Sequence, residues 1–243
     1  MRCARIPRGV VIAMAVAIAV ASSSQAAKKS RDAFWSRADF ATRKVDRIVL
    51  FPVVSYDNNI QSENQVEASV GAAFKGLSYR WLSGTTPRGL IRSQPAGDSL
   101  LKEVRKGILA GGRLDSLQAP ALAAALRCDA VLTMRIDQYE QHEPQWNEAG
   151  KPFTTIRLTA ALVDSAGRLL WSANGGDTGE GPYHDPNANA VGVNDTGLDR
   201  KPISGQSGAP AVREVLALIA PRWAEAFPKH SPPPAADSAA PPH

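Results

Sequence analysis

Apolar residues fall along the chain in blocks with two different periods. DRIVLFPVVS, residues 46–55, is a near-continuous apolar run of the kind found in a strand buried on both faces. Residues 130–142 begin apolar and then alternate, which also predicts a strand. TTIRLTAALVD and RLLWSANG stand on either side of Ser-Ala-Gly, and this arrangement predicts a hairpin with Gly167 in its turn. LSYRWLSG is expected to form one more short strand.

Other segments repeat their apolar residues every three or four positions, as helices do. They are residues 64–77, 85–93, 98–112, 115–128 and 209–227. Pro87 and Pro120 suit first turns, and Asp98 is the expected N-cap of the third segment, which Gly111 and Gly112 should end. Pro221 lies inside the last segment, where we expect a kink or a break.

The order of these elements predicts an α/β fold with a mixed sheet of about five strands and helices packed on its faces. Residues 46–227 should form this single domain. Residues 27–45 precede it as a mixed-charge lead-in, in which Phe34, Trp35 and Phe40 could dock. Residues 175–208 are rich in Gly, Asn and Asp, have no periodicity, and are expected to be a long loop.

Both ends of the chain differ from the rest in composition. Residues 1–26 combine Arg2, Arg5 and Arg8 with an apolar run and a small-residue ending, Ser24 and Ala26, which is the pattern of a cleaved signal peptide. No cysteine stands at the expected cleavage site, so the sequence predicts a periplasmic or secreted protein without a lipid anchor. An uncleaved N-terminal anchor is the alternative. Residues 228–243 are rich in Pro and Ala and are expected to be a disordered tail.

Charge and cysteine content exclude some classes of function. Three of the 28 basic residues belong to the signal peptide, which leaves 25 against 23 acidic residues. No basic run is interleaved with aromatic residues, so nucleic acid is not an expected partner. Cys128 is the only cysteine beyond the signal peptide, and its apolar surroundings favour a buried thiol without a disulfide.

Three motifs carry a resemblance to a known group. They are residues 47–52 (RIVLFP), the Cys-Asp-Ala at 128–130 before a strand, and the hairpin from Asp164 through Gly167 to Trp171. They resemble bacterial envelope proteins that include the curli-secretion lipoprotein, the Pel accessory lipoprotein, the penicillin-binding-protein activator lipoproteins and the N-terminal domain of the Tol–Pal translocation protein. The resemblance implies a fold similar to the anticodon-binding domain. It implies no catalytic residues, because each motif meets a strand or turn requirement.

Candidate metal sites are incomplete. DQYEQHE places His142 among carboxylates but offers no second, spaced histidine. Asp185, Asn187 and Asn189 alternate as in the first half of a calcium loop, yet the glycine and glutamate expected at its sixth and twelfth positions are missing. We therefore expect no metal and no cofactor, and turn formation explains the Asp and Asn residues equally well.

The sequence thus predicts a non-enzymatic exported envelope protein that binds another envelope component and supports assembly, secretion or cell-wall processes. The expected contact surface is the long loop with the free edge of the hairpin, and the contact residues are Tyr183, His184, Asp185 and Trp171. An envelope protein is the expected partner, and the sequence does not choose between a monomer and a homo-oligomer. The alternatives are a periplasmic metal-dependent hydrolase using His142 and His184, or a small-ligand-binding protein.

Overall fold

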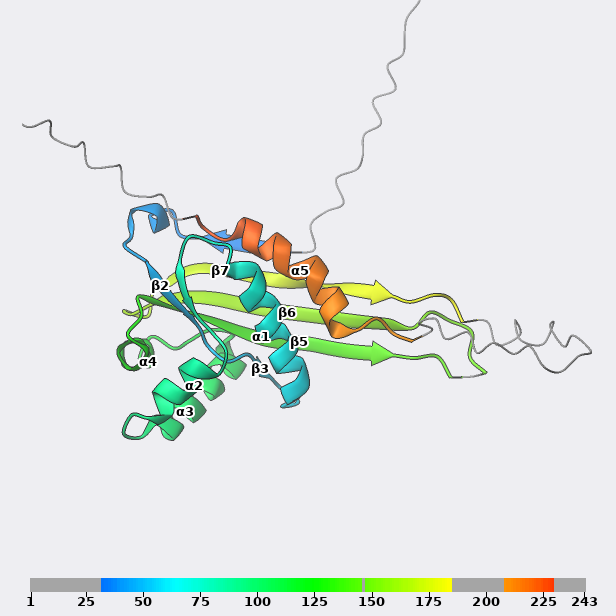
Figure 1. Cartoon of the computed structure of the whole chain (residues 1–243), viewed down its shortest axis with the longest axis horizontal. Coiled ribbons are helices and arrows are strands. Elements are labelled where there is room, and N and C mark those ends of the chain that lie inside the picture. Colours follow the sequence, from blue (N-terminus) through cyan, green and yellow to red (C-terminus); the bar gives the residue numbers. More distant parts are fainter. Residues whose placement is uncertain (1–31, 146, 185–207, 230–243) are drawn as a thin grey trace, which may run out of the picture. The chain divides into compact units, whose positions relative to one another are not determined.

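The computed structural model describes residues 32–145, 147–184 and 208–229, all within one compact unit. They form a seven-stranded mixed sheet with helices packed against it, which confirms the predicted α/β class (Figure 1). The signal-peptide pattern, Asp185 with the rest of the calcium-like motif, and residues 230–243 lie outside the described part of the chain.

The elements follow the predicted order, with two additional strands. The strands are β1 (Ala33–Ser36), β2 (Arg47–Leu50), β3 (Val54–Ser55), β4 (Arg80–Leu82), β5 (Ala130–His142), β6 (Phe153–Asp164) and β7 (Leu169–Glu180). The helices are α1 (Ile60–Phe74), α2 (Thr85–Arg92), α3 (Gly97–Gly111), α4 (Ala119–Leu126) and α5 (Val212–Ala226), with a short 3-10 turn at Phe40–Thr42.

The sheet order is β1-β7-β6-β5-β2-β4, and β3 also pairs with β5. β2 runs parallel to β4 and β5, whereas β5, β6, β7 and β1 form an antiparallel series. The early α/β crossovers therefore make the parallel half of the sheet, and the late hairpins make the antiparallel half.

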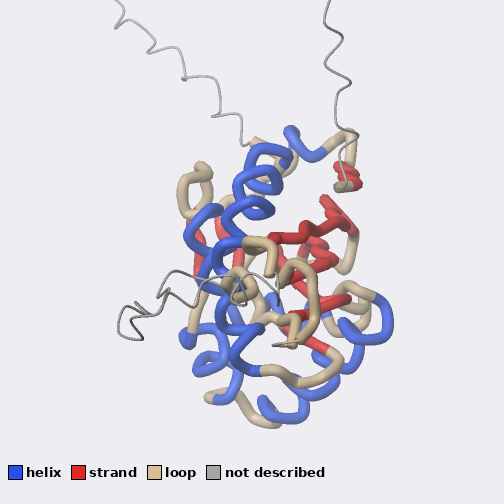
Figure 2. Tube along the Cα trace, turned by 90° about the vertical axis from the view of Figure 1, so that its right-hand side faces the viewer, coloured by secondary structure: helices blue, strands red, loops and turns tan. Residues whose placement is uncertain are grey.

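Helices cover the two faces of the sheet unequally, and Figure 2 shows them on two sides of the strands. On one face α1 and α5 enclose the larger core, which includes Val66, Phe74, Leu216, Ile219 and Trp223. On the other face α2, α3 and α4 enclose a smaller core around Ile91, Val104, Ile108, Leu122 and Leu126. In Figure 1 these three helices gather beside one end of the strands, and the other halves of β5, β6 and β7 run past them.

The predicted start of the long loop at residue 175 is wrong, because β7 continues to Glu180 in register with β6. Its glycines are needed for packing. A methyl group on Gly175 would collide with Asp32 Oδ1, one on Gly179 would lie 3.1 Å from Val215 Cγ2, and one on Gly181 would lie 2.8 Å from the Gly208 carbonyl oxygen. These glycines make the segment look unlike a strand in the sequence. In the fold they leave room for the neighbouring groups that pack against the strand.

The hairpin also has no free edge at β7, because β1 pairs with it antiparallel from Ala33↔Asn174 to Ser36↔Trp171. Part of the predicted lead-in thus belongs to the sheet, and β1 is its edge strand on that side. Four residues are too few to show a period in the sequence. The free edge that we expected on the hairpin belongs to β1.

Local turn and cap chemistry is largely as predicted. Gly167 has φ +79°, and Gly112 ends α3 with φ +69°, both in the left-handed region that favours glycine. Asp98 is not the N-cap of α3, since Ala96 holds that position and Asp98 lies in the first turn. α5 runs through Pro221 without a break. Among the described residues, no helix has the length and apolar character needed to cross a membrane.

Candidate functional site

Trp171, one of the four predicted contact residues, belongs to the core. Its side chain is 0% exposed, and its ring packs against Phe74, Trp223 and Phe227. The indole Nε1 donates to the Ala226 carbonyl at 3.2 Å. Its prediction as a contact residue is wrong, because the β7 register turns this side chain toward α1 and α5.

Tyr183 and His184 lie where the chain leaves β7. Tyr183 is 61% exposed. His184 forms an isolated antiparallel bridge with Gly150, whose two backbone hydrogen bonds measure 2.7 and 3.1 Å. This bridge joins the two segments that follow β5 and β7. Neither residue's contact with a partner is tested by the structure, and for both it stays a prediction.

The outer half of the sheet exposes one face. Side chains on the face opposite α1 and α5 are Gln138, Glu140, Thr155, Arg157, Asn174 and Thr178, and we call this set the open sheet face. The helix contact on this side lies further in, where Arg135 Nη1 donates to the Leu109 carbonyl near the end of α3 at 2.9 Å. Beyond Arg135 no helix of the described residues lies over these side chains.

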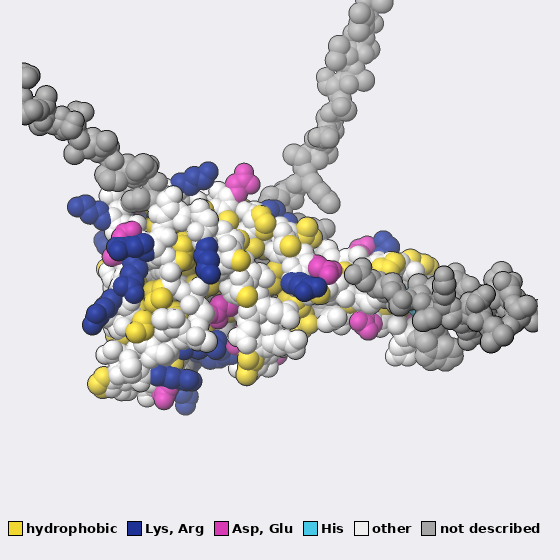
Figure 3. All heavy atoms as spheres, in the orientation of Figure 1, with side chains coloured by type: hydrophobic (Ala, Val, Ile, Leu, Met, Phe, Trp, Pro, Cys, Tyr) yellow, Lys and Arg dark blue, Asp and Glu magenta, His cyan; other side chains and the backbone are white. Residues whose placement is uncertain are grey.

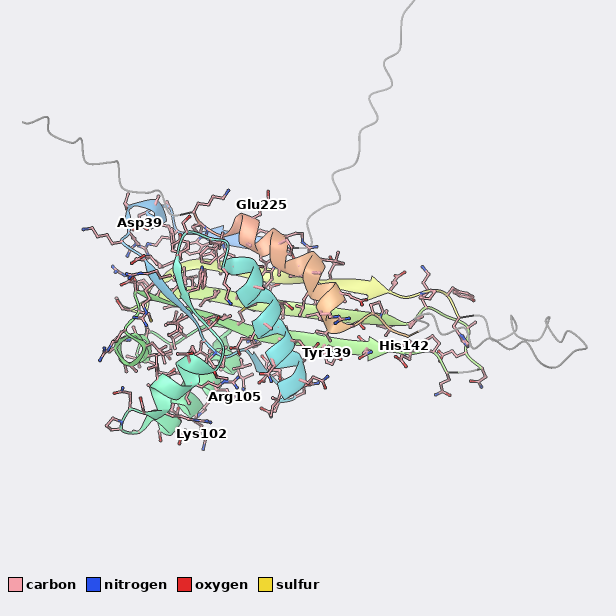
Figure 4. The ribbon with its side chains drawn as sticks, viewed as in Figure 1. Asp39, Lys102, Arg105, Tyr139, His142 and Glu225 are labelled. Carbon is pink, nitrogen blue, oxygen red and sulfur yellow. The ribbon has the colours of Figure 1, made fainter. Side chains whose placement is uncertain are left out.

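A β-bulge at Asp137 sets which side chains reach this face. The β5–β6 register shifts between Ile136 and Gln138, so Asp137 stays on the side of Arg135, which it pairs with at 2.5 Å. Thr159 donates to the other oxygen of Asp137. In a regular strand Asp137 and Tyr139 would share a face. They do not, because the bulge inserts one residue, and Tyr139 packs against the larger core (Figure 4).

Polar groups near the bulge satisfy one another. Asn174 donates to Thr159 Oγ1 at 2.8 Å, and the hydroxyls of Thr155 and Thr178 lie 2.8 Å apart. These bonds link neighbouring strands through their side chains.

Arg157 is the exception to this pairing. It is exposed and makes no recorded hydrogen bond or ion pair with the rest of the described chain. It lines a hollow of about 360 Å³ together with Gln138, Thr155 and Thr178. Its guanidinium therefore keeps its five N–H donors available to a partner.

Trp35 adds an aromatic group on the same side of the sheet. It pairs with Ser172 in the β1–β7 register and is 47% exposed. The sequence named Trp35 only as a possible docking point, and it did not single out Arg157. The alternation in TTIRLTAALVD contains the signal, since it puts Arg157 on the polar side of β6.

The carboxylates and histidines of the described residues do not form a metal site. No three His, Cys, Asp or Glu side chains come together there. The His142 ring lies 5.2 Å from that of Phe153, and Gln138 donates to Glu140 at 3.2 Å. At the same end of the sheet, a hydrogen bond from Lys151 lowers the pKa of the Glu180 carboxyl.

A cluster of basic side chains lies at the other end of the strands, to the left in Figure 3. Several arginines at this end pair with carboxylates. Arg43 bonds Asp39 at 2.8 Å and contacts Asp164 at 3.4 Å, and Arg168 bonds Asp164 at 2.8 Å. These alternating positive and negative side chains link the 3-10 turn to the β6–β7 hairpin. We therefore assign the ion pairs a role in stabilising the fold.

No protein-family model and no curated protein matches the chain. Among solved structures, lipoprotein GNA1162 of Neisseria meningitidis matches at 16% identity, over 60% of this chain and 90% of that one, with a TM-score of 0.38. A PelC dodecamer from Paraburkholderia phytofirmans matches at 13%, over 78% and 96%, with a TM-score of 0.37. The hypothetical protein CT253 from Chlamydia trachomatis matches at 11%, over 74% and 96%, with 0.35.

One of these proteins is named a lipoprotein, and another is PelC. Likenesses at these scores carry no inference about what the chain binds.

Proposed function

We propose that this is a non-enzymatic exported protein of the cell envelope that binds another envelope protein through the open sheet face. The observation that carries the proposal is the outer half of β5, β6 and β7, which extends beyond α2, α3 and α4 and presents Arg157 without a partner among the described residues. The signal-peptide pattern of residues 1–26 and the motif resemblance support the location in the envelope.

The composition of this face suits protein recognition. Arg and Trp are the residue types that most often dominate binding energy at interfaces, and here Arg157 and Trp35 are exposed on one side of the sheet. The hydroxyl and amide groups around these two residues can form hydrogen bonds with a partner at the polar rim of the interface.

The size of the face limits the kind of contact. The uncovered part of β6, residues 153–159, is roughly 20 Å long, and the three strands β5, β6 and β7 span roughly 10 Å there. This area of roughly 200 Å² is about a quarter of the ~800 Å² that each side of a standard interface buries. The partner must therefore also contact the rim, and Tyr183 at the end of β7 is suitably exposed.

The experiment is site-specific photo-crosslinking in cells. A photoreactive amino acid replaces Asn174 on the open sheet face. In a parallel control it replaces Glu103, which is exposed but lies on α3, away from this face. The expected result is one specific envelope protein captured from position 174 and absent from position 103.

A second variant tests the role of Arg157. Arg157→Ala should weaken binding of the purified captured protein by roughly thirtyfold, as expected for an arginine at an interface hot spot. Arg213→Ala is the matched control and should bind as the wild type does, because Arg213 is an exposed arginine of α5 without a partner among the described residues. Equal capture from both probe positions, or full affinity in Arg157→Ala, would refute the proposed surface.

A further inference from the structure

A small cavity opens between α1, α2 and α3, at the carboxyl end of β2. It has a volume of about 260 Å³. Its apolar wall is formed by Phe51, Pro52, Val54, Ile60 and Leu101. Ile60 is 66% exposed, so a large apolar side chain stands at the mouth of an apolar cavity. The carboxyl ends of parallel strands are a common place for ligands in open α/β sheets.

The one carboxylate in the lining is already neutralised. Glu63 is buried, and its Oε1 accepts hydrogen bonds from the backbone N–H and hydroxyl of Ser55, both at 2.9 Å. Arg105 Nη2 donates to the same oxygen at 2.8 Å. Glu63 and Arg105 therefore fasten α1 to α3 (Figure 4 labels Arg105), and Glu63 does not give the cavity a negative charge.

Arg88 is in a different situation. It lines this cavity and also the adjoining one of about 430 Å³ along α1. Its Nη2 lies 3.7 Å from Glu67 Oε2, beyond hydrogen-bond distance, and within the described chain no hydrogen bond of its guanidinium is recorded. Only 35% of its side chain is exposed, so a half-buried guanidinium retains unused donors.

Glu67 supplies the carboxylate beside Arg88. Its side chain is 8% exposed, and burial raises the pKa of its carboxyl despite the nearby Arg88 charge. Arg92 lies one turn further along α2 and also lines the cavity. Its pair with Asp98, at 3.2 Å, joins two exposed side chains, and such pairs contribute little.

We propose that this cavity binds a small amphiphilic carboxylate. Arg88 and Arg92 hold the carboxylate, and the apolar body lies against Phe51, Val54 and Leu101. The volume is that of roughly nine water molecules, which suits an acid of about ten heavy atoms, the size of octanoate. Such a group is available both as a free fatty acid and as the apolar C-terminal residue of a peptide. This inference does not depend on the proposed partner surface.

The test is calorimetric titration of the purified protein, without residues 1–26, with octanoate and with N-acetyl-leucine. Octanoate represents the free acid and N-acetyl-leucine the peptide terminus, and the tighter ligand identifies the source. Octan-1-ol has the same apolar body without the charge. We expect at least one carboxylate to bind and octan-1-ol to bind at least tenfold more weakly, because charge-assisted hydrogen bonds are the strong ones.

Two variants assign the binding to this cavity. Arg88→Met keeps the apolar stem and removes the charge, and it should weaken carboxylate binding tenfold or more, whereas Arg213→Met should leave it unchanged. Leu101→Phe reduces the cavity volume and should weaken carboxylate and alcohol alike. Binding of neither carboxylate, or equal binding to the wild type and Arg88→Met, would overturn the proposal. Circular dichroism of each variant establishes that a loss of binding does not reflect misfolding.

Discussion

Asp32 and Arg222 form an ion pair across 190 residues of sequence, with Arg222 Nε 2.7 Å from Asp32 Oδ2. Arg222 Nη1 bonds Asp177 at the same distance. One side chain of α5 thus holds the residue before β1 and a residue of β7. The Asp32 side chain is 1% exposed, so this pair fastens the edge strand of the sheet from within.

We expect Arg222→Met to release β1. The substitution leaves the buried Asp32 carboxylate without its arginine, and removal of one member of a buried pair costs roughly 3 kcal/mol. The free energy of unfolding from urea denaturation should fall by about this amount, and the amides of β1 should exchange faster. Arg213→Met on the same helix should stay within about 0.5 kcal/mol of the wild type. Unchanged protection of the β1 amides would show that pairing with β7 alone holds this strand.

A second prediction concerns the glycines of β7. Gly175→Ala places a methyl group on Asp32 and should destabilise the fold by roughly 2 kcal/mol through overpacking. Gly89→Ala is the control, because Gly89 lies inside α2 with no atom within 4 Å of an added Cβ. That substitution should stabilise the fold by roughly 0.5–1 kcal/mol. Thermal and urea unfolding of both variants show whether each substitution lowers or raises the free energy of unfolding. An unchanged free energy of unfolding in Gly175→Ala would contradict the packing argument.

The third prediction is an alkaline limit on stability. Burial raises the pKa of the Cys128 thiol from 9.0 to about 11, and burial raises the pKa of the Tyr79 hydroxyl from 10.0 to about 12. Because both pKa values are higher in the folded protein, the stabilisation is fully present below pH 9. It is then lost progressively as the pH rises through 11 and 12.

Urea unfolding at pH 7, 9 and 10.5 should therefore give similar free energies at the first two values and a lower one at the third. The Cys128 thiol should also be inert toward a disulfide reagent at pH 8 in the native protein and react after denaturation. Rapid labelling of the native protein would contradict its burial.

The fourth prediction concerns the link between α1 and α3. Arg105→Met leaves Glu63, with only 4% of its side chain exposed, without its cationic partner, and should cost roughly 3 kcal/mol. Lys102, one turn earlier on α3, is exposed, and Lys102→Met should change stability by less than about 0.5 kcal/mol. If the double variant Glu63→Leu with Arg105→Met is not more stable than Arg105→Met alone, an uncompensated Glu63 charge does not explain the loss.

Local sequence patterns were sufficient to predict the elements whose structure depends only on residues close together in the chain. The apolar run of β2, the alternation of β6 and the helical spacing of α1 identify these elements because one face of each must be buried. Gly167 marks the hairpin turn because a positive φ strains any residue with a Cβ. The α/β class follows from the order of such elements.

Contacts between distant residues decided the rest. β1 exists because β7 provides its hydrogen-bonding partner, and β7 extends past Gly175 because β6 pairs with it as far as Glu180. Residue 175 is a glycine because Asp32 occupies the space that a side chain would need. The Asp137 bulge shifts the alternation by one residue, so no count along the chain places Tyr139 on the correct face. The sequence by itself therefore determined most of the strands and helices, whereas the tertiary structure decided β1, the length of β7 and which surfaces remain open to a partner. The reason is that the spacing of apolar residues in a segment reflects which of its side chains are buried. Whether a polar face of that segment stays uncovered depends on where the other helices and strands end.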